Sequence, residues 1–169
     1  MPRRASALPS EIFLSHASAN RSFATRLAAA LRSTRLKVWY SASNIVGAQQ
    51  WHDEIGEALT RCDCFVLVLS PAAVKSQWVK RELLYALNNR RYEKRIVPAV
   101  YRECDWPKLS WTLDAIQMVD FTESFDAGWQ ALLKTDVFRD LPPAQTRMRG
   151  NARGKENRRR PVRKFRSGK

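Results

Sequence analysis

The apolar run CFVLVL occupies residues 64–69 and is followed by Ser70-Pro71 and by SQWVKREL at residues 76–83. A six-residue apolar run predicts a buried strand, and the Ser-Pro pair ends it before a segment with helical spacing. On that helix Trp78 and Glu82 lie four residues apart, so an aromatic ring and a carboxylate share one face. In open parallel sheets, ligands bind at the carboxyl ends of the strands, where this helix begins. The stretch therefore predicts both an α/β fold and the position of its site.

Outward from this stretch, strand-like and helical segments alternate. Predicted strands cover residues 12–15, 37–40, 64–69, 95–100 and 117–121. The first predicted helix is capped by Ser18 or Asn20 and runs to about residue 34. The second has Ile55 and Leu59 on its inner face. The other two predicted helices cover residues 76–90 and 125–134. Pro98 is unusual for a central strand and predicts a strand end or a bulge.

Five strands joined by helical crossovers predict a flavodoxin-like α/β three-layer sandwich. The apolar runs call for helices on both faces of a five-stranded parallel sheet, and right-handed crossovers favour the strand order 2-1-3-4-5. At 169 residues the chain fits one such domain. We expect an N-terminal extension over residues 1–8, the domain over 9–138 and a tail over 139–169.

The net charge of +14 is concentrated at the C-terminus. Residues 147–169 contain 11 Lys or Arg and one Glu, whereas the rest of the chain has 19 basic and 15 acidic side chains. A segment this polar buries too little apolar surface to offset its ordering entropy, so we expect a disordered basic tail. It could remain a solvated extension, or bind nucleic acid, an anionic membrane surface or an acidic partner.

The sequence disfavours kinase, NTPase and Rossmann dehydrogenase functions, because the motifs of these classes are missing. GxGxxG, the GxxxxGK[ST] phosphate loop and the GxSxG nucleophile elbow do not occur. His16 and His52 are the only histidines, so a carboxylate would have to carry any chemistry. The three cysteines show neither disulfide nor metal-ligand spacing, and no apolar stretch nears the roughly 20 residues of a membrane span. We expect a cytoplasmic protein without a bound metal, cofactor or secretory signal.

The chain resembles the Toll/interleukin-1 receptor (TIR) domains across residues 9–138. EIFLSHAS at 11–18 is similar to their first-strand signature, and VWY at 38–40 with a loop to Gly47 is similar to their second strand and BB loop. FVLVLSP at 65–71 with Ser76-x-Trp78-x-x-x-Glu82-Leu83 matches the third strand and the following helix. IVP at 96–98, DWP at 105–107 and VDF at 119–121 complete the series. His16 and the lack of an RDxxPG loop suggest a prokaryotic member.

The resemblance implies cleavage of the nicotinamide–ribose bond of NAD⁺, which would be a substrate rather than a cofactor. Glu82 matches the catalytic glutamate of active relatives, where it would stabilise the cationic ribose. We expect Ser15, His16, Trp78 and Ser41 at the substrate. Water attack would give ADP-ribose, and internal attack a cyclic ADP-ribose isomer. Such activity would serve bacterial immunity or cell-death signalling.

The resemblance also implies other TIR domains as partners. Ile45, Val46 and Gly47 form the loop that lies at subunit contacts in the family, so self-assembly would switch on the activity. Some relatives have arginines where this chain has the small residues Ala17 and Ser18. Arg21 or Lys75 would therefore have to bind the nucleotide phosphates.

Alternative interpretations remain for the same residues. Glu82, which follows Lys80 and Arg81, could be a solvated or ion-paired surface residue. Trp78 could fill the core, and His16 could bond a strand-end carbonyl. We expect His52 at the surface. Many active relatives carry an acid where this chain has Ser41, so a non-enzymatic TIR adaptor or virulence module is the rival function.

Overall fold

The computed structural model describes residues 8–40 and 48–142, and of residues 48–51 only the backbone. The strands are β1 (Glu11–Ser15), β2 (Lys37–Trp39), β3 (Cys64–Leu69), β4 (Ile96–Val100) and β5 (Val119–Asp120). The α-helices are α1 (Arg21–Ser33), α2 (Ala48–Arg61), α3 (Pro71–Lys75), α4 (Gln77–Leu87) and α5 (Phe125–Leu133). Four 3-10 turns add η1 (Ser18–Asn20), η2 (Arg90–Tyr92), η3 (Trp106–Lys108) and η4 (Trp111–Ala115).

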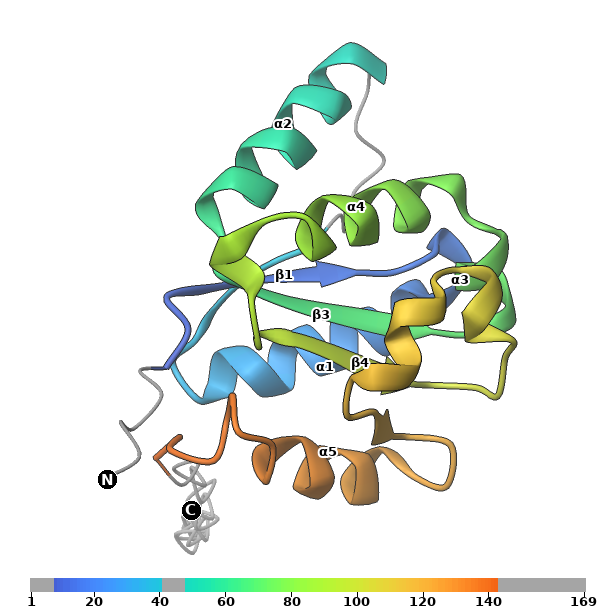
Figure 1. Cartoon of the computed structure of the whole chain (residues 1–169). Coiled ribbons are helices and arrows are strands. Elements are labelled where there is room, and N and C mark those ends of the chain that lie inside the picture. The colour runs from blue at the N-terminus through green and yellow to red at the C-terminus, as the bar shows by residue number, and fades with distance from the viewer. Residues whose placement is uncertain (1–7, 41–47, 143–169) are drawn as a thin grey trace, which may run out of the picture.

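The strands form one parallel sheet in the order β2-β1-β3-β4-β5, which confirms the predicted fold class and topology. In Figure 1, α2 and α4 cover one face of the sheet, and α1 and α5 cover the other. Parallel strands need crossover connections, and helices on both faces supply them.

Side-chain alternation divides the core between the two faces. In β1, Ile12 and Leu14 belong to the cluster under α1 and α5, whereas Phe13 belongs to the cluster under α2 and α4. Phe13 stacks between Trp39 and Phe65, with ring centroids 4.7 and 5.5 Å apart. This period of two decides which face each residue at a strand end points to.

The segment after β3 differs from its prediction. Residues 71–75 are helical rather than a loop, because Ser70 caps α3 through the Ala73 N–H and Pro71 occupies the first turn. Ser76 caps α4 in the same way through Val79, and α4 ends at Leu87 before η2 rather than at residue 90. Asn20 lies at the start of α1 but makes no side-chain cap.

Pro98 is neither at an end of β4 nor in a bulge, because it pairs with Leu67 in the middle of the strand. The backbone of Tyr101 bonds β3, and that of Val100 bonds Phe121 beyond β5, so alternate residues of β4 face opposite neighbours. Pro98 therefore turns its nitrogen toward β5. Since β5 begins opposite Ala99, the missing N–H leaves no ladder acceptor unpaired.

The packed body reaches beyond residue 138. Leu141 lies against the cluster under α1 and α5, and its N–H donates to the Phe138 carbonyl. The predicted tail boundary and the N-terminal extension stay predictions, because most of both lies outside the described residues. In the part of the chain that the structure describes, no helix is both long and apolar enough to cross a bilayer.

Candidate active site

Ser15 is the last residue of β1, and the strand's alternation turns it toward α4. It follows Phe13 by two residues and so points to the same face, beneath α2 and α4. Its side chain is buried, with 1% of its surface exposed. Ser15 thus stands at the carboxyl end of a strand next to the sheet's centre, where α/β proteins bind their ligands.

Glu82 lies on the inner face of α4. The buried residues of this helix are Val79, Glu82, Leu83 and Ala86, which recur at the spacing of one helix face. Glu82 is the carboxylate in an otherwise apolar stripe, and only 8% of its surface is exposed. The interpretation of Glu82 as a solvated surface residue is therefore wrong.

Ser15 and Glu82 form one buried pair, in which the serine Oγ donates a hydrogen bond of 2.5 Å to Oε2 of the carboxylate. Burial raises the pKa of Glu82 to about 7, while the Ser15 hydrogen bond lowers it in part. A carboxyl group with a pKa near neutrality changes its charge in the physiological range. Such a group in a sheet-end site is a candidate for function.

Trp78 lies one turn before Glu82, and its ring contacts His52 of α2. It is half-buried, and the edge-to-face contact of its ring with His52 has a centroid distance of 4.8 Å. The Arg81 guanidinium lies 5.3 Å from the tryptophan ring centroid. His52 is exposed, as predicted, but the sequence did not indicate that it holds the Trp78 ring.

His16 follows Ser15 and uses one ring nitrogen locally. Nδ1 lies 2.9 Å from the Ala17 carbonyl oxygen, so it must donate, and in the neutral ring Nε2 carries the lone pair. The ring also lies 6.0 Å from that of Tyr40, which follows β2. The alternative role of His16, a bond to a strand-end carbonyl, is thus present, and a contact of His16 with the substrate stays a prediction.

A second buried polar pair lies beyond the carboxyl ends of the strands. Ser70, after β3, donates a 2.6 Å hydrogen bond to Oδ1 of Asn20, which precedes α1. Next to Asn20, the Nε atom of Arg21 is buried without a hydrogen-bond partner among the described residues. The sequence indicated Asn20 only as a helix cap, and a local rule could not find its contact with Ser70, 50 residues away.

Ser41 and the loop residues Ile45, Val46 and Gly47 lie outside the described residues, so their predicted roles stay predictions. Within the described ranges, no three His, Cys, Asp or Glu side chains gather in a way that could hold a metal ion. Of the predicted site residues, the structure brings Ser15 and Glu82 into contact. His16 directly follows Ser15 at the end of β1, and Trp78 lies one turn before Glu82 on α4.

The family model of the TIR domain matches residues 12–133, from β1 to the end of α5. The chain belongs to the TIR domain family. A search of the curated proteins finds no match.

Two solved structures have the same fold. The TIR domain of the Toll-related receptor TRR-2 from Hydra magnipapillata is 18% identical, with a TM-score of 0.59 over 74% of this chain and 96% of that chain. A metazoan TIR-STING receptor from C. gigas, solved in complex with 2′,3′-cGAMP, is 19% identical, with a TM-score of 0.58 over 78% of this chain. The match spans only 41% of the receptor chain. The prokaryotic origin stays a prediction.

Proposed function

We propose that this TIR domain cleaves the nicotinamide–ribose bond of NAD⁺ and that Glu82 is its catalytic carboxylate. The observation that carries the proposal is the buried Glu82–Ser15 pair at the carboxyl end of β1, within the segment that matches the family motif. A carboxylate inside an apolar helix stripe destabilises the fold, which a purely structural role does not explain.

The chemistry needs few groups. The bond between C1′ of the ribose and the ring nitrogen breaks, its electron pair leaves with nicotinamide, and the cationic ring becomes a neutral molecule, so no general acid is required. The ribose gains oxocarbenium character, which ionised Glu82 stabilises at short range in a site of low dielectric. Water then adds to C1′ and loses a proton to give ADP-ribose, or another atom of the same nucleotide attacks and closes a ring.

The remaining residues have positioning roles in this proposal. Ser15 holds the Glu82 carboxylate, Trp78 would border the substrate on the α2 side, and His16 would contact the ribose or the nicotinamide. Arg21, whose buried Nε has no hydrogen-bond partner in the part of the chain that the structure describes, is the candidate for the nucleotide phosphates. The Ile45–Gly47 loop is proposed to complete the site when copies assemble.

The second candidate is a TIR module that acts only through protein contacts. Two observations favour it: Ser41 stands where many active relatives carry an acid, and the carboxylate of Glu82 is almost fully enclosed in this conformation. An adaptor would need the fold but not the ionised carboxylate. The two functions therefore differ in whether Glu82 is needed for any activity.

The test measures nicotinamide release from NAD⁺ by the purified full chain, over a series of protein concentrations and with a crowding agent, because assembly is proposed to activate the site. We expect Glu82→Gln to lower turnover at least 100-fold, the order reported for loss of one electrostatic stabiliser. The matched control is Glu123→Gln, which alters an exposed carboxylate and should leave turnover unchanged.

Two outcomes would count against the enzyme. Equal release by Glu82→Gln and wild type would show that another group carries the chemistry. A wild-type protein that self-associates yet releases no nicotinamide at any concentration would favour the adaptor. Product identity follows from the same reaction, since ADP-ribose and its cyclic isomers separate by chromatography.

A further inference from the structure

The first residues of β4 lie at an open edge of the sheet. β5 pairs only with Ala99 and Val100, so residues 96–98 have β3 on one side and no register partner in β5 on the other. The sequence predicts a strand from residue 117, whereas the pairing of β5 begins only at Val119. A trough of about 650 Å³ lies where a longer β5 would have covered β4.

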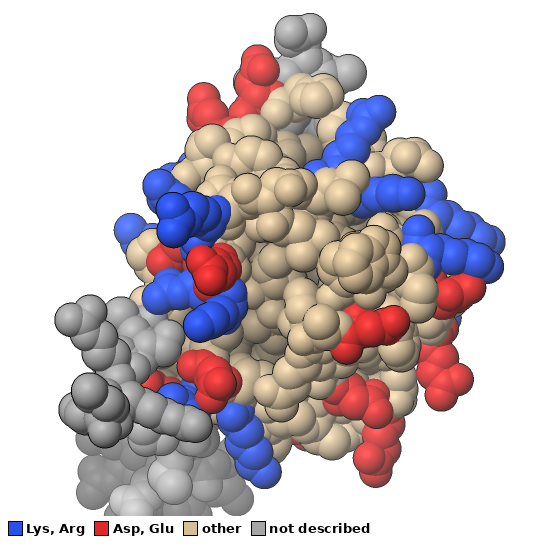
Figure 2. Space-filling view, viewed as in Figure 1, with Lys and Arg blue, Asp and Glu red and all other residues tan. Residues whose placement is uncertain are grey.

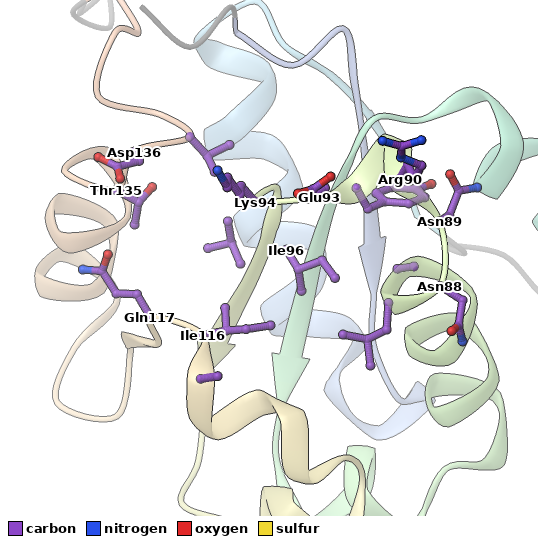
Figure 3. Close-up of a pocket in the computed structure, with 16 residues that line it drawn as sticks. Asn88, Asn89, Arg90, Glu93, Lys94, Ile96, Ile116, Gln117, Thr135 and Asp136 are labelled. Atoms are coloured by element: carbon purple, nitrogen blue, oxygen red, sulfur yellow. The ribbon is translucent and has the colours of Figure 1, made fainter. Parts of the chain in front are cut away.

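The trough is bounded by the end of α4 and by the segment after α5. Its apolar lining comes from Ala86, Leu87, Ile96, Ile116 and Val137. In Figure 3, Ile96 and Ile116 lie in the middle of the trough, with Asn88 on one side and Thr135 and Asp136 on the other. Its volume is that of a site for a small ligand or for a few residues of a peptide.

The backbone of Ile96 faces this trough without a partner. The Phe65 N–H donates to the Arg95 carbonyl, and Phe65 pairs with Ile96 in register, so Arg95 and Val97 face β3 and Ile96 faces the other way. In the described parts of the chain, no backbone group outside the strands bonds the Ile96 N–H or C=O, and β5 starts too late to reach them. An unpaired donor and acceptor on a strand edge are a template for another strand.

The rim of the trough carries charges of both signs. The charged residues that line it are Arg90, Glu93, Lys94 and Asp136. Figure 2 shows basic and acidic side chains next to one another at the left, where Figure 1 places this end of the sheet. Asp136 pairs with Arg139 at 2.9 Å, and no ion pair among the described residues involves the other three. With two cations and two carboxylates, the rim has no net charge that would select a polyanion.

The two faces of the sheet decide where the side chains of an added strand would point. Ile96, Leu87 and Ile116 pack on the cluster under α2 and α4, whereas Val97 and Val137 belong to the cluster under α1 and α5. Residues paired across two strands direct their side chains to the same face. A residue opposite Ile96 would therefore place its side chain beside Leu87 and Ile116. The residues before and after it would point toward Val97 and Val137.

We propose that the trough binds a peptide segment of a partner protein, which adds to the open edge of β4 as a short extended strand with an aliphatic residue opposite Ile96. Strand addition satisfies the Ile96 N–H and C=O and needs no net charge on the ligand. The uncovered residues 96–98 span roughly 10 Å, so a segment of about three residues fits. The trough lies at the amino-terminal end of the sheet and Glu82 at the carboxyl end, so the peptide can bind whether or not the domain cleaves NAD⁺.

The test measures peptide binding to the ¹⁵N-labelled full chain by NMR titration. The probes are two capped pentapeptides that differ only in the central residue, which is leucine or glycine between threonines, with a glycine at each end. We expect the leucine peptide to bind at least about tenfold more tightly, because its side chain leaves water. Its binding should slow hydrogen exchange of the Ile96 amide, and N-methylation of its three central amides should weaken binding at least about tenfold. Added salt should change the Kd less than about twofold, because the rim charges cancel.

A bulky substitution tests the position of the site. Ala115, the exposed last residue of η4, lines the trough. We expect Ala115→Trp to weaken binding of the leucine peptide at least about tenfold, because the indole takes the space of the peptide. The matched control is Ala29→Trp, at an exposed alanine of α1 on the other face of the sheet, which should leave the Kd unchanged.

Three results would overturn the proposal. A leucine peptide that does not bind at millimolar concentration would show that the trough has no affinity for an extended segment. An N-methylated peptide that binds as tightly as its parent would show that the ligand is not held as a strand. If no peptide bound, and Ala115→Trp but not Ala29→Trp reduced self-association in sedimentation, the trough would be a contact between copies of this chain. Thermal unfolding at the wild-type temperature would confirm that both variants are folded.

Discussion

Replacing Glu82 by glutamine should stabilise the domain at alkaline pH. Glutamine has the shape of a protonated glutamic acid, and its amide oxygen can still accept the hydrogen bond from Ser15. The wild-type carboxyl group is enclosed and has no cationic partner among the described residues, so its charged form is disfavoured in the folded state. The variant removes this penalty without opening a cavity.

The magnitude follows from the pKa of Glu82, which burial raises from 4.5 to about 7 on folding. Well below pH 4.5 the Glu82 carboxyl group is protonated in both the folded and the unfolded state, so it does not lower the free energy of unfolding. As pH rises from there toward 7, only the unfolded chain ionises, so the free energy of unfolding falls, and it levels off above the folded-state pKa. A pKa difference of about 2.5 corresponds to about 3 kcal/mol, most of it lost between pH 5 and 8.

The assay is urea unfolding of wild type and Glu82→Gln from pH 5 to 8.5, followed by tryptophan fluorescence. We expect the variant's advantage to grow by about 2.5 kcal/mol over this range, which is a difference of roughly 1 M in urea midpoint at a typical slope. The difference between the two proteins removes contributions from the titratable groups that they share. Glu123→Gln, at an exposed carboxylate, should show no such trend.

A variant advantage that does not change between pH 5 and 8.5 would refute the argument, because Glu82 would then have the same pKa in both states. An advantage that shrank as pH rises would indicate a depressed pKa and an unseen cationic partner. Either result would also remove the reason to regard this carboxylate as poised near neutrality.

Three further substitutions test the local structure. Ser15→Ala removes the hydrogen bond that lowers the pKa of Glu82, so the midpoint of the pH-dependent stability loss should move upward, as read from the same urea series; an unchanged midpoint would show that the serine does not contact the carboxylate in solution. Gly128→Ala would place a Cβ 2.3 Å from Phe121 Cδ1 and 2.8 Å from the Asp120 carbonyl oxygen, and should cost about 1–3 kcal/mol or more in thermal unfolding. Gly56→Ala, with open space around it in α2, should instead stabilise by about 0.5–1 kcal/mol, and equal effects at both glycines would contradict the packing at Gly128.

The fold could be predicted because its signals are local and repeat along the chain. Continuous apolar runs such as residues 64–69 mark strands covered on both faces, and right-handed crossovers restrict their order. The prediction was wrong where two local signals competed. After β3, the Ser70-Pro71 pair predicts a loop, but the same pair also starts a helix. Pro98 predicts a strand end or a bulge, but its effect depends on how far β5 extends, which the local sequence does not show.

The site was predictable only in part. Residue types and spacing indicated Glu82 and Trp78, yet the pattern alone favoured an exposed glutamate that follows two charged residues. Its burial follows from the phase of the helix, since Val79, Leu83 and Ala86 set the inner face and Glu82 falls within it. The hydrogen bond that Glu82 accepts from Ser15, 67 residues away, could not be predicted locally. It depends on the side-chain alternation of β1 and on where α4 packs, and the second of these is known only once the sheet is known.

The position of Glu82 also links stability to function. An apolar residue in the α4 stripe would avoid a penalty of about 3 kcal/mol at pH 8, a large fraction of the stability of an ordinary domain. The Ser15 hydrogen bond recovers only part of this, because the pKa remains raised. A cationic nicotinamide next to the carboxylate would restore its ionised form, so substrate and carboxylate should stabilise each other. NAD⁺ binding should therefore strengthen as pH rises through 7, and this dependence should vanish in Glu82→Gln; an adaptor that binds no cation has no reason to show either effect.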